Sequence, residues 1–176
     1  MAAALGVLQC GHEAVLYEKN EKLGKKLYIT GKGRCNVTNA CETEELFSHM
    51  VSNGKFLYSA IYGFTNFDMM ELLEVAGCPL KTERGGRVFP VSDKSSDVIA
   101  ALKRKLEKEG AEIHLNEPVE ELLFENGRVC GVILKNGHRS VRAGAVIAAT
   151  GGLSYPATGS TGDGYGFAKA AGHTVT

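Results

Sequence analysis

The chain has 176 residues, with 20 Lys and Arg against 20 Asp and Glu, and 44% of its residues are hydrophobic. This length and apolar content are enough for about one domain with an ordinary core, and they exclude a disordered chain. The formal net charge of zero removes the bulk electrostatic argument for a nucleic-acid or acidic-membrane partner. No apolar run approaches the roughly 20 residues that a membrane-spanning helix needs.

The cysteine pattern and the start of the chain bear on its compartment. The five cysteines are odd in number, and none has the two-residue spacing of a zinc knuckle or a thioredoxin-like pair. No metal site is therefore expected, and a reducing compartment fits best. The opening residues 1–8 are apolar but lack the positively charged start of a secretory signal. We expect a soluble, cytoplasmic protein without a membrane partner.

The first part of the chain reads as a helix, a strand, a long loop and further helices. Small helix-forming residues occupy positions 2–10, and residues 13–18 form a short apolar strand that ends in an acid. The Gly- and Lys-rich stretch 23–39 shows neither the hydrophobic periodicity of a helix nor that of a strand, and it is predicted to be a loop. Loops of this length are commonly functional. A helical insertion is predicted over about residues 42–78, with one helix capped by Asn66.

The second part is predicted to be richer in strands. A hairpin over residues 80–90 turns at a Gly-Gly pair, and an amphipathic helix follows from about residue 95. Two Asn-Gly dipeptides predict a three-stranded antiparallel β-meander over about residues 118–142. Residues 145–149 are predicted to be a fully apolar strand, and Asp163 is predicted to cap a final helix.

The acid at the end of the first strand is the first candidate functional residue. A strand that ends in an acid, after a helix of small residues, is typical of the second half of a dinucleotide-binding unit, where the carboxylate binds ribose hydroxyls. Glu18 holds this position. Many strands end in an acid, so a purely structural role for Glu18 stays open. The G-x-G-x-x-G fingerprint belongs about 20 residues ahead of the acid, which would be before Met1.

The Gly- and Lys-rich loop is the second candidate. Residues 24–36 fail the Walker A pattern, because Gly33 stands where that pattern requires Ser or Thr. Glycines let backbone N–H groups approach an anion or a planar ring, and nearby cations offset phosphate charge. The alternative is a solvated basic loop that touches RNA. The cations in question are Lys25, Lys26, Lys32 and Arg34.

Two glycine-rich stretches near the end of the chain complete the candidates. The apolar strand predicted at 145–149 runs into Thr150, Gly151 and Gly152, a turn of the kind found where a cofactor crosses the carboxyl ends of parallel strands. Residues 158–166 precede the last helix, whose N-terminus could face a phosphate or a flavin edge. Neither stretch establishes a site alone, and a plain capped helix is the alternative for the second.

Taken in order, these segments resemble the BaiN/YhiN-type NAD(P)/FAD-dependent oxidoreductases, a branch of the flavoproteins with two dinucleotide-binding domains. The resemblance implies an α/β fold, namely an incomplete Rossmann-like FAD-binding domain with a three-stranded antiparallel meander. Relatives carry a Gly-rich strand and turn before the position of Met1 and continue past Thr176, so the chain is expected to be a partial domain over residues 1–176, without the substrate domain. The resemblance rests on residues 17–19, 24–39, 86–94, 149–152, 155–156 and 161–165.

The resemblance also implies a function and a set of cofactor contacts. It implies an FAD-dependent oxidoreductase that acts on a small molecule rather than on nucleic acid, with NAD(P)H as a candidate electron donor; it names no catalytic residue. The alternative is a flavin-free fragment that acts as a binding module or has no independent function. Glu18 would bind the adenosine ribose, and Val119 would offer backbone atoms to the adenine. The implied cofactor-binding residues are Glu18, Lys19, Gly24, Lys25, Lys26, Thr30, Gly31, Lys32, Gly33, Arg34, Cys35, Asn36, Val119, Thr150, Gly151 and Gly152.

Overall fold

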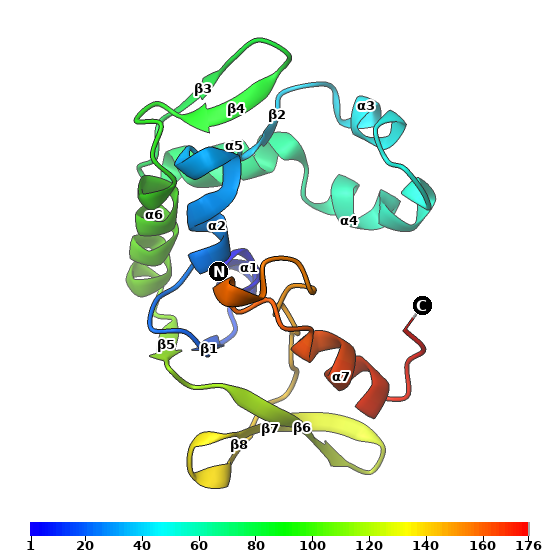
Figure 1. The fold of residues 1–176 in the computed structure, drawn as a ribbon. Coiled ribbons are helices and arrows are strands. Elements are labelled where there is room, and N and C mark those ends of the chain that lie inside the picture. Colours follow the sequence, from blue (N-terminus) through cyan, green and yellow to red (C-terminus); the bar gives the residue numbers. More distant parts are fainter. Residues whose placement is uncertain (176) are drawn as a thin grey trace. The chain divides into compact units, whose positions relative to one another are not determined.

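The computed structural model describes residues 1–175, and they form two compact units. One unit holds the first and the last parts of the chain, and the other holds the segment between them. The chain leaves the first unit within helix α2 and returns to it within helix α6 (Figure 1). The first unit comprises Met1–Lys26 and the residues from Leu106 onward, the second comprises Leu27–Lys105, and the two linking helices are α2 (Lys25–Ile29) and α6 (Ser95–Lys108).

The first unit contains a parallel pair of strands that begins as the sequence predicts. Helix α1 (Ala2–Gln9) feeds strand β1 (Val15–Glu18), and β1 pairs in parallel with β5 (Glu112–Leu115). Glu18 lies opposite Leu115 in this register. Because the two strands are parallel, their carboxyl ends lie at the same edge, where α/β proteins bind their ligands. Glu18 therefore stands at the edge at which a nucleotide is expected.

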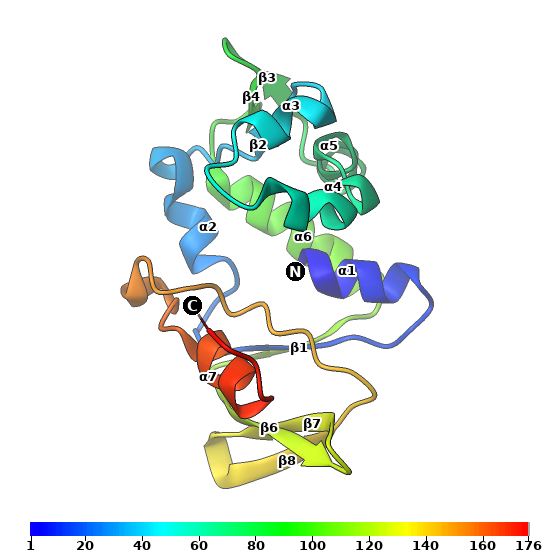
Figure 2. The same cartoon turned by 90° about the vertical axis from the view of Figure 1, so that its right-hand side faces the viewer.

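The predicted β-meander is confirmed. Strands β6 (Val119–Glu125), β7 (Arg128–Leu134) and β8 (Arg139–Arg142) pair as antiparallel neighbours in the order β6-β7-β8. Asn126 and Gly127 both have positive φ, 51° and 73°, as a two-residue hairpin turn of type I′ requires. Helix α7 (Asp163–Ala170) lies beside β6 (Figure 2).

Two expectations about the end of the chain are wrong. Residues 145–149 form no strand, and Ile147 is 59% exposed. A strand requires a ladder of hydrogen bonds to a neighbour, and within residues 1–175 none pairs with this apolar run. Asp163 does not cap α7 either, because the N-cap position is held by Gly162 and Asp163 is the first helical residue.

Short elements occupy residues 25–39, a stretch for which the sequence predicts one irregular loop. Residues 25–29 form the helix α2, Thr30–Gly33 form a turn of 3-10 helix, and Thr38–Asn39 form the strand β2. None of these elements is long enough to display a periodicity of its own. The strand β2 exists because it pairs across the chain with β4, antiparallel, with Thr38 opposite Val88. The prediction of an irregular loop is therefore wrong for these segments.

For the other elements of the second unit, the sequence predicts the correct type of secondary structure. The hairpin of β3 (Leu80–Thr82) and β4 (Arg87–Pro90) is confirmed, and with β2 it makes a sheet in the order β2-β4-β3 (Figure 1). Helix α6 follows the hairpin, as expected. The segment predicted to be helical contains α3 (Thr43–Ser48), a 3-10 turn at Gly54–Leu57, α4 (Tyr58–Gly63) and α5 (Asn66–Val75).

The cap of α5 lies one residue earlier than the sequence analysis placed it. Thr65 is the N-cap, and it forms a reciprocal capping box with Asp68. Asn66 is buried and connects α5 to the end of β2 and the segment that follows it, because its side-chain amide donates to the carbonyls of Asn39 and Cys41, at 2.8 Å each. The side chain of Asn66 is therefore used for a tertiary contact and not for the helix end.

Among the described helices, none combines the length and the apolar character that a membrane span needs.

Each unit has a buried apolar core. The buried apolar side chains include Leu5, Val132, Leu134 and Phe167 in the first unit, and Leu73, Val88, Phe89, Val98 and Leu102 in the second.

Gly131 in β7 provides a test of the meander. A Cβ atom added at Gly131 would lie 2.0 Å from the carbonyl oxygen of Val141 in β8, so the two strands would have to separate. We expect Gly131→Ala to lower the free energy of unfolding by roughly 1–3 kcal/mol, measured by urea denaturation with circular dichroism. Gly144→Ala is the matched control, since a Cβ there meets nothing within 4 Å. Equal denaturation midpoints for the two variants would contradict the pairing of β7 with β8.

Candidate functional site

Strand β1 ends at Glu18, and the following loop holds its carboxylate. Oε1 of Glu18 accepts hydrogen bonds from the backbone N–H of Asn20 at 2.8 Å and from Nδ2 of Asn20 at 2.7 Å. The same Nδ2 also donates to the carbonyl of Thr158 at 3.3 Å. From residues 1–175 no hydrogen bond reaches Oε2 of Glu18. The half-buried carboxylate is therefore fixed through one oxygen, and the other receives no hydrogen bond, although the α-ammonium of Met1 attracts the carboxylate electrostatically.

A second carboxylate lies at the same edge of the parallel pair. The backbone N–H of Glu117, just after β5, donates to the carbonyl of Glu18 at 3.1 Å. The side-chain Oε2 of Glu117 is buried and accepts no hydrogen bond from the described residues. Two carboxylates disfavour a phosphate by like-charge repulsion, and the Glu18 carboxylate can accept hydrogen bonds from hydroxyl or amine groups. This edge suits the sugar and base of a nucleotide better than its phosphates.

Lys19 is tied to the start of α7. Its Nζ lies 2.6 Å from Oδ2 of Asp163 and 2.5 Å from Oγ1 of Thr161. Burial raises the pKa of Asp163, but the hydrogen bonds from Lys19 and Thr161 outweigh it and hold the pKa below its usual value. Asp163 is thus ionised at neutral pH and compensates the charge of Lys19. This lysine therefore has little charge left to offer to a phosphate.

The glycine-rich stretches of the first unit pack closely within the protein. A Cβ at Gly151 would lie 3.0 Å from Oγ of Ser160, and a Cβ at Gly164 would lie 2.8 Å from Oγ1 of Thr150. A Cβ at Gly152 would lie 3.1 Å from the hydroxyl of Tyr165. Residues 150–152, which the sequence analysis placed at a cofactor, therefore lie against residues 160–165. These contacts explain the glycines without requiring a ligand.

The remaining candidates of the first unit have mostly ordinary structural partners. Lys25 pairs with Glu21, four residues earlier in the chain, at 3.2 Å. Lys26 donates to the carbonyl and hydroxyl oxygens of Ser154, at 3.1 and 2.7 Å. Gly24, with φ of 72°, precedes α2, and Val119 is the half-buried first residue of β6. The two lysines are therefore engaged within the unit.

In the second unit, residues 31–35 form a tight turn with unusual backbone geometry. Gly31, Lys32, Gly33 and Cys35 all have positive φ, from 55° to 88°. A Cβ at Gly31 would lie 2.8 Å from the backbone nitrogen of Asn36, so this position requires glycine. The backbone N–H of residue 34 donates to the carbonyl of Gly31, and that of Cys35 donates to the carbonyl of residue 30. These two N–H groups are therefore used within the turn.

Arg34 is held by two carboxylates. Its Nη2 lies 2.5 Å from Oε1 of Glu83 and 2.6 Å from Oδ1 of Asp93, and its Nε donates to Asp93 at 3.0 Å. Lys81 adds a 2.6 Å ion pair to the other oxygen of Asp93. The guanidinium carbon lies 4.1 Å from the ring centre of Phe89. This arrangement fixes the turn to the β3–β4 hairpin and neutralises Arg34, which was expected to offset phosphate charge.

The other members of the turn divide into buried and exposed groups. Cys35 is 1% exposed, and burial raises the pKa of its thiol, so the thiol stays protonated at neutral pH and packs in the interior. Lys32 is exposed and forms no ion pair with any described residue. Asn36 is also exposed, and Thr30 donates through its hydroxyl to the carbonyl of Leu27 at 2.7 Å. Lys32 is thus the cation of this stretch that is available to a ligand.

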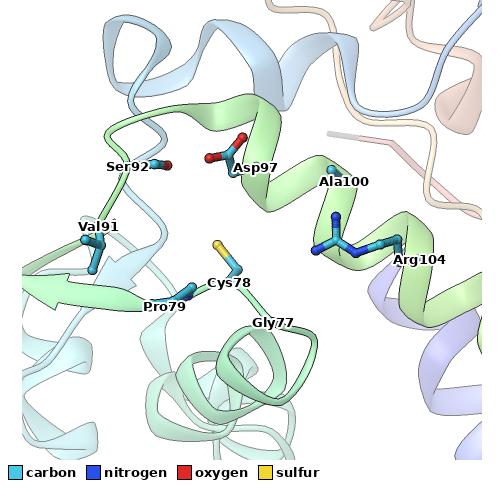
Figure 3. Close-up of a pocket in the computed structure, with 8 residues that line it drawn as sticks. All are labelled: Gly77, Cys78, Pro79, Val91, Ser92, Asp97, Ala100 and Arg104. Atoms are coloured by element: carbon cyan, nitrogen blue, oxygen red, sulfur yellow. The ribbon is translucent and has the colours of Figure 1, made fainter.

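The second unit has a surface hollow of about 430 Å³ beside α6 (Figure 3). The thiol of Cys78 points into it, while Asp97 and Arg104 are exposed at its rim. Burial, and then the nearby Asp97, raise the pKa of Cys78, so this thiol is not activated. Within residues 1–175, no group of three or more His, Cys, Asp and Glu could hold a metal ion. The hollow is lined by Gly77, Cys78, Pro79, Val91, Ser92, Asp97, Ala100 and Arg104, none of which was a predicted site residue.

Several residues that shape the candidate site were missed by the sequence analysis. Asn20 holds Glu18, Asp163 compensates Lys19, and Ser154 binds Lys26. Asn20 carried a usable signal, because an amide side chain just after a strand commonly bonds to groups two residues away. The partners at 154 and 163 carried none, since they lie more than 120 positions away in the sequence.

The fold defines the class of the protein, and a sequence comparison gives its family. The parallel pair that ends in an acid, together with the antiparallel three-stranded sheet, belongs to a Rossmann-like α/β domain. The HI0933-like protein Rossmann domain matches residues 1–176, so the chain belongs to that family. This match confirms the resemblance and the fold class expected from the sequence.

Individual relatives are moderately similar to the chain. It is 29% identical over 178 residues to the 3-dehydro-bile acid delta(4,6)-reductase of Clostridium scindens, covering 100% of this chain and 42% of that protein. It is 29% identical over 174 residues to the ribosomal RNA dihydrouridine synthase of Haemophilus influenzae, covering 98% and 42%. The chain thus spans less than half the length of these relatives. A solved flavocytochrome c3 fumarate reductase shares the fold, with a TM-score of 0.63 at 23% identity over 96% of this chain and 38% of that one.

The network around Arg34 predicts an acid-sensitive second unit. The hydrogen bond from Arg34 lowers the pKa of Glu83, and hydrogen bonds from Lys81 and then Arg34 lower the pKa of Asp93. Carboxyls with a lower pKa in the folded state stabilise it fully above their ordinary values of about 4, and this stabilisation is lost as the pH falls through the folded values.

We therefore expect the free energy of unfolding to fall from about pH 5 downward, and Glu83→Gln to make this fall shallower. Urea denaturation at a series of pH values measures both. Glu74→Gln is the control, because Glu74 is exposed and forms no ion pair among the described residues. A pH dependence that both substitutions change equally would show that the network is not its source.

Proposed function

We propose that this chain is a cofactor-binding part of an FAD-dependent oxidoreductase. The observation that carries the proposal is the free Oε2 of Glu18 at the carboxyl edge of the β1–β5 pair, in a chain of a Rossmann-domain family. A carboxylate in this position accepts hydrogen bonds from the ribose hydroxyls of a dinucleotide. The name of one relative, a reductase, is in keeping with redox chemistry.

The first set of proposed contacts serves the adenosine half of FAD. The residues fit that half, because the oriented Glu18 carboxylate accepts hydrogen bonds from hydroxyl donors, while the neighbouring Glu117 adds negative charge that disfavours a phosphate. In the proposal, Glu18 accepts from the ribose, Val119 offers its backbone to the adenine, and residues 150–152 lie along the cofactor. Lys19, Lys25 and Lys26 support these segments through the contacts they make within the protein, and Gly24 provides the positive-φ turn ahead of α2. The bound flavin would supply the hydride transfer, and the protein would place it and tune its potential.

The second set of proposed contacts comes from the turn at residues 30–36. Gly31, Gly33 and Asn36 would let the backbone approach the cofactor closely, and Lys32 would supply positive charge. Arg34 and Cys35 would act indirectly, since one is neutralised by carboxylates and the other is buried. Thr30 would fix the start of the turn.

The substrate and the electron donor are proposed from the resemblance. We propose a small-molecule substrate and NAD(P)H as the donor, in a cytoplasmic protein whose five cysteines are free. One relative is named for a bile acid and another for ribosomal RNA, so RNA is the competing substrate class. The pairing of Lys25, Lys26 and Arg34 within the protein favours the small molecule. RNA binding that weakens steeply with salt, without flavin uptake, would favour instead a flavin-free binding module.

Glu18 provides the direct test of cofactor binding. We expect Glu18→Gln to weaken FAD binding about tenfold or more, because a charge-assisted hydrogen bond to the ribose is lost, with an unchanged circular dichroism spectrum. Quenching of flavin fluorescence during titration of the apoprotein measures the affinity. Glu13→Gln, an exposed acid ahead of the same strand, should bind FAD like the unmodified protein. If both variants bind FAD equally well, Glu18 does not contact the cofactor.

A further inference from the structure

We propose that Asn20 is a positioning residue that sets the preference of this site for a sugar with free hydroxyls. The inference rests on the proposed function, because it assigns a role at the adenosine end of the same site. Asn20 donates twice to Oε1 of Glu18, once from the backbone and once from the side chain. The backbone and side-chain nitrogens of Asn20 thus donate to the same carboxylate oxygen of Glu18, and Oε2 of Glu18 is left for the ligand.

Asn20 is itself anchored on two further sides. Its carbonyl accepts a 3.0 Å hydrogen bond from the backbone N–H of Asn116, which follows β5. Its Nδ2 also donates to the carbonyl of Thr158 in the glycine-rich stretch before α7. The amide is thus held between the ends of β1 and β5 and that stretch. A side chain fixed in this way can hold the Glu18 carboxylate in one orientation before any ligand arrives.

Gly159 supplies the space that Asn20 occupies. A Cβ at Gly159 would lie 2.5 Å from Nδ2 of Asn20 and 3.3 Å from Cε of Lys19. Gly159 has φ of 97°, a backbone conformation that other residues rarely adopt. The absence of a side chain here lets the amide of Asn20 reach Glu18 and Thr158 together. The glycine is therefore accounted for by the placement of Asn20.

The chemistry of Asn20 is specific to an amide. Aspartate has nearly the same shape, but its carboxylate cannot donate to Glu18 and repels it. Alanine removes the side-chain donor and leaves the backbone donor alone. In either case the Glu18 carboxylate gains rotational freedom that ribose binding must then remove, and preorganisation is lost. The loss should appear only in the part of the affinity that comes from the ribose hydroxyls.

The test compares the affinity of AMP with that of 2′,3′-dideoxy-AMP. Both are measured by NMR titration of the full-length protein without bound flavin. We expect the unmodified protein to prefer AMP about tenfold, as one charge-assisted hydrogen bond provides. Asn20→Asp and Asn20→Ala should each reduce this preference at least threefold and change the affinity for the dideoxy nucleotide less than twofold. Asn20→Ser, which retains a short donor, should recover part of the preference.

Two controls separate positioning from a general structural effect. Asn126→Asp makes the same chemical change in an exposed turn that also accepts Asp-Gly, and it should leave the preference unchanged. Glu18→Ala should abolish the preference, and adding Asn20→Ala to it should have no further effect on that preference. Circular dichroism checks that each variant is folded.

The outcomes distinguish this inference from the proposed function. Equal losses of AMP and dideoxy-AMP affinity in the Asn20 variants, or an unchanged preference, would overturn the positioning role while Glu18 keeps its own. An unmodified protein that shows no preference for AMP, with Glu18→Ala behaving identically, would overturn the proposed adenosine site together with the inference.

Discussion

The asymmetry of the Glu18 carboxylate is the interaction on which the functional argument depends. One oxygen accepts hydrogen bonds from the backbone and the side-chain nitrogens of Asn20, and the other accepts none from residues 1–175. An acceptor that is already oriented costs little entropy when a hydroxyl binds to it. The parallel pairing of β1 with β5 places this group at the edge where Rossmann-like domains bind the ribose. The acidic Glu117 beside it adds negative charge that disfavours a phosphate at this edge.

The charges that looked most functional in the sequence turn out to be largely internal. Arg34 is bound by Glu83 and Asp93, and Lys19 is bound by Asp163. Ion pairs of this kind fix loops, but they reduce the field available to a phosphate. In each unit, the basic residues thus stabilise local geometry, and Lys32 alone among the predicted cations is without a partner among the described residues. The cofactor proposal therefore depends on acceptors and backbone geometry more than on positive charge.

The elements that could be predicted are those whose signal is local. The Asn-Gly dipeptides predict the meander. A short apolar segment that ends in an acid predicts strand β1 and the position of Glu18 at its carboxyl end. The strand β2 and the contacts of Lys26 could not be predicted, because their partners lie far away in the chain. The apolar run at 145–149 shows the converse, since strand-like composition gives no strand without a neighbour to pair with.

The most direct test of the central claim is a crystal structure of the protein with FAD. The account predicts the ribose hydroxyls within hydrogen-bond distance of Oε2 of Glu18, while Oε1 keeps its two bonds from Asn20. An adenosine bound elsewhere, or a Glu18 carboxylate turned away from the sugar with both oxygens engaged by the protein, would contradict it.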